Sequence, residues 1–169
     1  MIFRKTKKEE VNEVMKIINE GKILLKNNGI DQWQNGYPNE EAILRDILND
    51  ESYVLEHNNK IIGTTALSFN GEKTYETIYE GKWISNGKYA VVHRIAACKI
   101  DEIKSIGTEI LKEVEKICLL RNIKNIKIDT HENNKAMQGL LLKNNYIYCG
   151  VIYLEDGSKR LAFEKELGR

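Results

Sequence analysis

The chain has 169 residues, of which 41% are hydrophobic and 30% charged. A chain of this size buries enough apolar surface for one core, and its composition excludes both a disordered and a collagen-like protein. The 26 Lys and Arg residues nearly balance the 25 Asp and Glu residues, and the formal charge of +1 gives no reason to expect nucleic acid as a partner. We therefore expect a single domain over residues 1–169.

The N-terminal residues and the cysteines both bear on the compartment. The first ten residues lack the apolar segment of a signal peptide, and no run of about eighteen apolar residues is found. The cysteines are far apart, form no CxxC pair and have no histidine at metal-ligand spacing: Cys98, Cys118 and Cys149. We expect a cytoplasmic protein with no membrane partner, no disulfide and no metal site.

Capping and breaker residues mark two helices after a short N-terminal strand. The sequence Thr6-Lys7-Lys8-Glu9 has the form of a capping box, whose hydroxyl and carboxylate accept hydrogen bonds from amides at a helix start. Apolar residues then recur at helical spacing until Asn27-Asn28-Gly29, which is a typical stop. In chain order we expect a strand over 2–5, a helix from Thr6 to that stop, an irregular aromatic loop over 29–38 and a helix from Asn39 to 48.

The rest of the chain predicts mainly strands. Asn58-Asn59 suits a hairpin turn because asparagine tolerates left-handed backbone, and Asp156-Gly157 suits a second turn. Segment 70–88 has no clear period and is expected to be a loop with room for a short helix. The other elements are expected to be strands over 52–56, 60–69, 89–98, 126–129, 146–154 and 159–165 and helices over 106–118 and 134–143.

The turn from the strand over 89–98 into the next helix is the main functional signal in the residues themselves. A loop that enters a helix directs free backbone N–H groups and the positive end of the helix dipole to one point, which suits an anion. Gly107 lets a ligand approach the backbone, and Ser105 and Thr108 beside it are small and polar. The pattern indicates a phosphate-binding turn, although any strand-to-helix turn with a glycine has the same form.

The order of elements and two motifs resemble the GNAT (GCN5-related) N-acetyltransferase family over essentially the whole chain. The stretch Glu102-Ile103-Lys104-Ser105-Ile106-Gly107 stands where the family carries Arg/Gln-x-x-Gly-x-Gly/Ala, with only the last glycine kept. The segment from Asn134 to Tyr146 is similar to the family's N-x-x-A-x-x-L-Y-x-K-x-G-F, with Asn145 at the turn glycine. Leu141 stands where many members carry a tyrosine that protonates the leaving thiolate, so that acid is missing.

The resemblance implies a fold and a cofactor. The fold is α/β (α+β), a central mixed, twisted β-sheet of about six to seven strands flanked by about four helices. The cofactor is acetyl-CoA, with its pantetheine arm and thioester on the backbone of the fourth strand and its pyrophosphate on the amides that open the third helix. The residues implied for the cofactor are Ile95, Ala96, Ala97, Glu102, Ile103, Lys104, Ser105, Ile106, Gly107 and Thr108, with Asn134 beside the CoA arm.

The implied reaction is direct attack of an amine on the thioester, which requires a base. His93 in the fourth strand is one candidate because imidazole exchanges protons near neutral pH; a histidine hydrogen-bonded for structural reasons is the alternative. His131 follows the fifth strand and could line the cleft or simply end the strand. Glu76 and Glu80 are further candidates, with solvated surface carboxylates as the alternative. Arg94 is expected to face away from His93 and to pair with a carboxylate.

The resemblance places the acceptor among the first two helices and the loops before the fourth and after the sixth strand. Aromatic residues interleaved with acids there suit a cationic amine. For the two tryptophans, burial under their own loops is the alternative. The candidate walls are Asp31, Gln32, Trp33, Tyr37, Tyr75, Trp83 and Tyr153.

The sequence thus predicts an acetyl-CoA-dependent N-acetyltransferase that acts on a small-molecule or peptide amine. The alternative is a non-catalytic acyl-CoA-binding or sensing module of the same fold, which the missing tyrosine and the altered phosphate loop both allow. Neither the acceptor nor the oligomeric state follows from the sequence, and a homodimer is one of the states left open.

Overall fold

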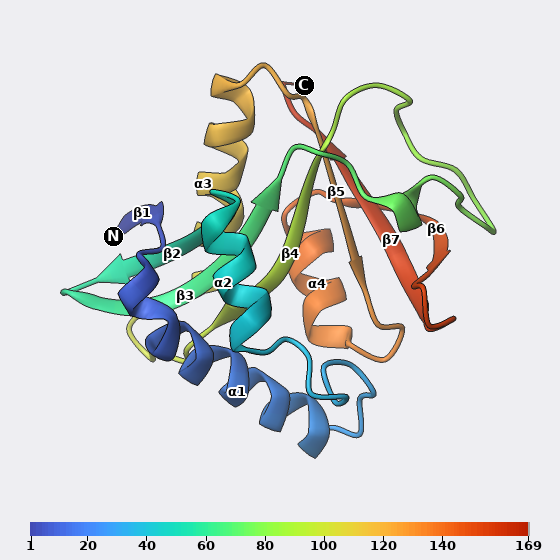
Figure 1. Cartoon of the computed structure of the whole chain (residues 1–169). Coiled ribbons are helices and arrows are strands. Elements are labelled where there is room, and N and C mark those ends of the chain that lie inside the picture. The colour runs from blue at the N-terminus through green and yellow to red at the C-terminus, as the bar shows by residue number, and fades with distance from the viewer. Residues whose placement is uncertain (169) are drawn as a thin grey trace. The chain divides into compact units, whose positions relative to one another are not determined.

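The computed structural model describes residues 1–168 and contains seven strands, four α-helices and two short 3-10 helices (Figure 1). This order of elements and the mixed α/β class are those that the sequence predicts. The elements are β1 (Ile2–Lys5), η1 (Lys8–Glu10), α1 (Val11–Asn27), α2 (Glu40–Leu48), β2 (Ser52–His57), β3 (Lys60–Ser68), η2 (Lys73–Tyr75), β4 (Ala90–Ala97), α3 (Ile106–Leu120), β5 (Asn125–Thr130), α4 (Lys135–Lys143), β6 (Ile147–Tyr153) and β7 (Lys159–Glu166).

The strands form a sheet in the order β1-β2-β3-β4-β5-β7-β6. β4 and β5 are parallel, and the ladders β1–β2, β2–β3, β5–β7 and β6–β7 are antiparallel. The chain divides into two compact units. Met1–Leu67 and His93–Glu113 form the first unit, and Ser68–Val92 with residues 114–168 form the second.

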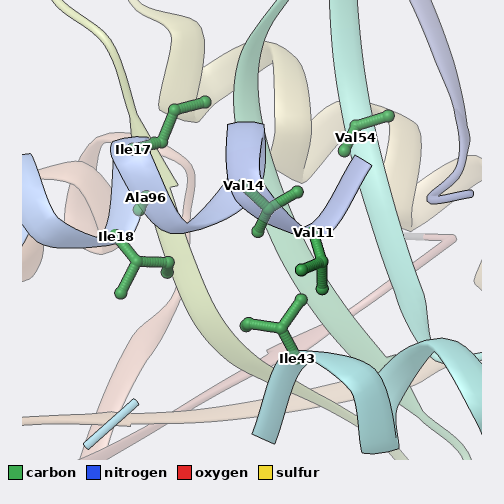
Figure 2. Packing of buried hydrophobic residues seen from close by; sticks show 7 residues of the cluster. All are labelled: Val11, Val14, Ile17, Ile18, Ile43, Val54 and Ala96. Carbon is green, nitrogen blue, oxygen red and sulfur yellow. The ribbon is translucent and has the colours of Figure 1, made fainter. Parts of the chain in front are cut away.

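Apolar side chains of α1 and α2 form the core of the first unit together with β2 and β4 (Figure 2). Val11, Val14 and Ile18 recur at helical spacing and are 7%, 0% and 0% exposed, so they form the buried face of α1. Full burial of one such side chain contributes about 1.5–3 kcal/mol to the free energy of unfolding. Packing of this buried face therefore stabilises α1 more than the helix propensity of its residues does. The cluster consists of Val11, Val14, Ile17, Ile18, Ile43, Val54 and Ala96.

The residues predicted to end α1, to cap α2 and to form the turn between β2 and β3 have these roles in the structure. Gly29, with φ of 69°, follows the end of α1, and the Asn39 side chain accepts a hydrogen bond from the Ala42 amide at 2.9 Å to cap α2. Asn58 and Asn59 have φ of 50° and 61° and form the two-residue turn between β2 and β3.

The predicted capping box at Thr6 and Glu9 is wrong by one residue. Thr6 is buried, and its hydroxyl is hydrogen-bonded to that of Ser52 at 2.7 Å. The carboxylate that accepts from a backbone amide is Glu10, 2.8 Å from the amide of Lys7. The other carboxylate oxygen of Glu10 lies 2.7 Å from Nη2 of Arg4 in β1. This ion pair explains why Glu10 rather than Glu9 takes the capping position. The helix α1 begins after the single turn η1.

Turn residues also set the ends of β6 and β7 in the second unit. Asn145 adopts φ of 66° between α4 and β6, as expected for an asparagine at a turn-glycine position. The Asp156 side chain accepts from the amide of Ser158 at 2.9 Å and Gly157 has φ of 85°, so the predicted hairpin turn is confirmed. The core beneath includes Tyr75, Val91, Ile152 and Ala162.

The segment between β3 and β4 is mostly loop with the short helix η2, as expected. Part of it runs along β6, where Tyr79 and Val151 exchange backbone hydrogen bonds of 2.8 Å. No helix within residues 1–168 is long and apolar enough to cross a membrane. Over the same range, no group of three or more His, Cys, Asp or Glu side chains is placed to hold a metal ion.

Candidate active site

The C-terminal half of β4 contains a residue in an unusual conformation. Arg94 has φ of 52°, a left-handed backbone conformation that is uncommon for a residue other than glycine. The Thr65 hydroxyl donates to the carbonyl of His93 at 3.1 Å, and the Cys98 amide donates to the carbonyl of Ile62 at 2.8 Å. Bonds to β3 therefore hold the chain on both sides of Arg94.

The Arg94 side chain connects β4 to α2 and to the loop before it. Nε and Nη2 donate to the two carboxylate oxygens of Asp46 at 2.7 and 2.6 Å, and Nη1 donates to the hydroxyl of Tyr37 at 2.7 Å. Burial opposes the charge of Arg94, but the bonds to Asp46 outweigh it, so the pKa of Arg94 lies above its ordinary value. The prediction that Arg94 pairs with a carboxylate is confirmed.

The start of α3 has the features of an anion-binding turn. The Ser105 hydroxyl accepts from the Thr108 amide at 3.2 Å and donates to the Thr108 hydroxyl at 3.0 Å, so Ser105 caps the helix. The amides of Ile106 and Gly107 precede the point where intrahelical bonding begins, and Lys104 is exposed beside them. These N–H groups, the dipole end and the cation fit a phosphate group, although Ser105 already uses one amide of the turn.

A glycine in β3 lets α3 approach the strands closely. A Cβ on Gly63 would lie 2.7 Å from Cδ1 of Ile110, 3.1 Å from Cγ2 of Ile106 and 3.4 Å from the carbonyl oxygen of Ala96. The first turns of α3 and the end of β4 thus meet over Gly63. Gly63 is not among the residues predicted for the site, and a glycine inside an apolar strand is the signal that could have revealed it.

The other residues expected at the cofactor lie along β4 and the loop that follows. Ile95 is half-buried, Ala96 is buried and Ala97 is exposed at the end of the strand. In the loop, the Ile103 amide donates to the carbonyl of Ile100 at 3.1 Å, and Glu102 is exposed. The first unit therefore brings together every predicted cofactor residue except Asn134.

Asn134 precedes α4 and Leu141 lies within it, both in the second unit. The Asn134 side chain accepts from the amide of Met137 at 3.1 Å and caps the helix. Leu141 is fully buried, so the position for which the resemblance implies a tyrosine is apolar here. His131 lies just before α4, and its Nδ1 accepts from the amide of Asn133 at 3.0 Å. Whether His131 lines the cleft or only ends the strand stays a prediction.

The expected acceptor residues of the first unit lie in the α1–α2 loop. Trp33 is half-buried against the α1 core, with its ring 3.3 Å from where a Cβ on Gly21 would lie. Gln34 donates to the carbonyl of Gln32 at 3.0 Å and braces the loop. Tyr37 is 45% exposed while Arg94 fixes its hydroxyl, so its ring is available to a ligand. Asp31 is exposed in the same loop.

Two aromatic residues expected at the acceptor pack on each other in the second unit. Tyr75 is 2% exposed, its ring centroid is 5.2 Å from that of Trp83, and its carbonyl accepts from the indole N–H of Trp83 at 2.8 Å. The Tyr75 hydroxyl donates to Asp129 at 2.5 Å, and burial and this carboxylate raise the pKa of Tyr75. Asp129, at the end of β5, was not predicted as a partner.

Glu76 and Tyr153 share an open hollow of about 480 Å³ on the second unit. The rings of Tyr79 and Tyr153 meet edge to face with their centroids 5.4 Å apart. Two carboxylates and two tyrosines form a wall that suits an organic cation. The lining residues are Lys73, Thr74, Glu76, Thr77, Tyr79, Tyr153 and Glu155.

Residues 22–146 match the family model of the GNAT acetyltransferase family. A GNAT acetyltransferase structure from Streptococcus agalactiae is 32% identical, with a TM-score of 0.84 and coverage of 99% of this chain and 96% of the other. A Staphylococcus aureus structure described as an acetyltransferase is 27% identical, with a TM-score of 0.74 and coverage of 99% and 100%. The PaiA N-acetyltransferase of Thermoplasma acidophilum, solved with coenzyme A, is 20% identical, with a TM-score of 0.68 and 98% coverage of both chains. The sequence matches no curated protein.

Proposed function

The chain belongs to the GNAT acetyltransferase family, and from this membership we propose that it transfers the acetyl group of acetyl-CoA to a primary amine of a small molecule or peptide. The observation that carries the proposal is the start of α3, where helix amides and Lys104 meet the end of β4 over Gly63. The coenzyme A bound to the T. acidophilum neighbour supports the choice of cofactor.

The chain's own residues account for binding of the cofactor. The amides of Ile106 and Gly107 would hold the pyrophosphate, with Lys104 adding a positive charge. Backbone groups of β4 at Ile95–Ala97 would hold the pantetheine arm and polarise the thioester carbonyl. Acetyl-CoA supplies an acetyl group on a thiolate leaving group.

In the transfer step, the amine nitrogen forms a bond to the acetyl carbon and the carbon–sulfur bond breaks. A bound ammonium group first loses one proton to solvent, because only the neutral amine can attack. The nitrogen gives up a second proton as the amide forms, and His93 in β4 is the base that we propose to accept it. The buried Leu141 provides no acid for the sulfur. A thiolate whose ordinary pKa is about 8.5 leaves with modest help, so the missing tyrosine is compatible with turnover.

The acceptor that we propose is a cationic amine. The exposed ring of Tyr37 in the first unit and the hollow with Glu76 and Tyr153 in the second both suit an ammonium group. The cytoplasm is the compartment that we propose, because all three cysteines are free, as is usual under reducing conditions.

Release of CoA thiol from acetyl-CoA in the presence of an amine panel tests the enzyme. We would use spermidine, tryptamine, lysine and a peptide with a free N-terminal alanine, and expect at least one to raise thiol release above the reaction without amine. Mass spectrometry should find that amine heavier by one acetyl group.

The second candidate is a non-catalytic acyl-CoA sensor, which the apolar Leu141 favours. A rise in Tm with acetyl-CoA, without thiol release from any amine, would select the sensor. Absence of acetyl-CoA binding in calorimetry would reject both functions.

A further inference from the structure

We propose that Arg94 is a positioning residue for the acceptor side of the reaction, acting through Asp46 and Tyr37. This inference rests on the proposed function. It starts from the backbone of Arg94, which adopts φ of 52° between His93 and the strand residues proposed to hold the thioester. A non-glycine residue keeps this conformation only where its surroundings determine it, and such residues concentrate at functional sites.

A buried ion pair with Asp46 holds the side chain of Arg94. Its guanidinium makes a bidentate pair with Asp46, with donor–acceptor distances of 2.7 and 2.6 Å. The two side chains are 14% and 9% exposed, so the pair is little screened by solvent. Asp46 is one of the buried residues of α2, a helix whose place is fixed by Ile43 in the core (Figure 2). The pair therefore anchors the left-handed residue of β4 to the core.

The third contact of Arg94 carries that anchor to the α1–α2 loop. Nη1 donates to the hydroxyl of Tyr37 at 2.7 Å, while the Tyr37 residue stays 45% exposed. The tyrosine thus has a fixed hydroxyl end and an open ring, which is the arrangement expected of a wall that must present its face to a ligand. One planar group makes all three bonds, and the single ammonium of a lysine does not reproduce this fork.

The expected effect of Arg94→Lys follows from these contacts. The charge is kept, but the fork is lost, so Tyr37 and the loop around it become mobile. The KM for the amine that gives most thiol release in the panel should rise about tenfold, the effect of one lost charge-assisted hydrogen bond. Calorimetric Kd for acetyl-CoA should stay within about twofold. Asp46→Asn should have the same effect, and the double variant should be no worse than either single one.

Arg4→Lys is the matched control. Arg4 also lies in the first unit and bridges two carboxylates, Glu10 at 2.7 Å and Glu56 at 2.8 Å, but its partners are in β2 and η1. Arg4→Lys should lower Tm about as much as Arg94→Lys does and leave the KM for the acceptor unchanged. If Arg94→Lys raises the acceptor KM no more than Arg4→Lys does, the positioning role is rejected.

A second measurement needs no acceptor and is independent of the proposed function. The chain has two tryptophans, so 5-fluorotryptophan labelling gives two fluorine resonances, Trp33 in the α1–α2 loop and Trp83 in the second unit. Trp83→Phe assigns them. Arg94→Lys should broaden or shift the Trp33 resonance and leave that of Trp83 unchanged, whereas Arg4→Lys should change neither. An unchanged Trp33 resonance in Arg94→Lys overturns the positioning role, whether or not a panel amine is acetylated. A shifted Trp33 resonance without thiol release from any amine would reject only the proposed acetyltransferase function.

Discussion

Lys127 and Glu164 form an ion pair inside the second unit, with Nζ 3.7 Å from Oε1 and side chains that are 4% and 0% exposed. The Lys127 ammonium also lies over the rings of Trp83 and Tyr89, 4.3 and 4.0 Å from their centroids. Burial lowers the pKa of Lys127, and the charge of Glu164 counters that effect. Glu164 accepts in addition from the amide of Ile84 at 2.6 Å, so the pair fixes the loop before β4 to the sheet.

Loss of Glu164 should therefore destabilise the protein strongly. Glu164→Ala leaves a charged amine and loop amides buried without their partner, and we expect the free energy of unfolding in urea to fall by about 3–5 kcal/mol. Glu155→Ala, which removes an exposed carboxylate of the same unit, should change it by less than about 0.5 kcal/mol. The double variant Lys127→Met, Glu164→Gln should recover part of the loss, because it removes the unpaired charge. Equal effects of Glu164→Ala and Glu155→Ala would contradict this account.

Two glycines of the second unit should respond to alanine in opposite directions. A Cβ on Gly81 would lie 1.9 Å from the carbonyl oxygen of Cys149, so backbone must move, and we expect a loss of about 3 kcal/mol in the free energy of unfolding. Gly139 is an exposed glycine inside α4 with nothing within 4 Å of a Cβ, so alanine should raise that free energy by about 0.5–1 kcal/mol. Urea denaturation of both variants measures the difference in sign.

Two buried thiols should make the protein less stable in alkali. Burial raises the pKa of Cys118 to about 12 and that of Cys149 to about 11, from 9.0. Between pH 9 and these values the unfolded chain loses thiol protons that the folded chain keeps, so each thiol lowers the free energy of unfolding by up to about 1.4 kcal/mol per pH unit.

Urea denaturation at pH 8 and pH 10.5 isolates that contribution. The free energy of unfolding of Cys118→Ala should fall less between the two pH values than that of the wild type. The cavity that alanine leaves is present at both pH values and does not affect this difference. Lysines and tyrosines contribute equally to the two proteins and cancel in the comparison. A pH dependence identical to the wild type would show that Cys118 does not titrate as its burial requires.

Substitution of the phosphate-turn glycine should block the cofactor. The side chain of Gly107→Trp would fill the space in front of the first amides of α3, and we expect the Kd for acetyl-CoA to rise at least about a hundredfold. Gly87→Trp is the control, because a Cβ there meets nothing within 4 Å. Titration calorimetry measures both, and unchanged affinity in Gly107→Trp would place the pyrophosphate elsewhere.

The proposed base should act on turnover and not on binding of the cofactor. His93→Ala should lower kcat by about 10²–10⁴-fold and leave the Kd for acetyl-CoA within twofold. His57, at the β2–β3 hairpin, provides the control, and His57→Ala should keep the wild-type rate. The pH–rate profile decides the role, since a residual activity with the wild-type profile would exclude His93 as the base.

Much of the fold could be read from the sequence because its signals are local. The caps and turns at Asn39, Asn58-Asn59 and Asn145 depend on the conformational preferences of the residues themselves, and all three are found as predicted. The Thr6 capping box failed for the opposite reason. Ser52, 46 residues away, takes the Thr6 hydroxyl, so a tertiary contact overrides the local one.

The candidate site likewise combines local features, which the sequence predicts, with contacts that only the fold creates. The glycine-bearing turn that opens the helix after β4 could be predicted from local residues, because helix geometry leaves amides unpaired at any such start. The predicted roles of His93, Glu76 and Asn134 remain predictions.

Which charged groups meet depends on the folded chain and could not be predicted from local sequence. Arg94 pairs with Asp46 over 48 positions of sequence, and Tyr75 bonds Asp129 over 54. Such partners carry no periodic signal, because a polar side chain needs only one complementary group at the right place and the fold alone determines that place. Gly63 and Gly81 are similar, since the neighbour that excludes a Cβ comes from another element.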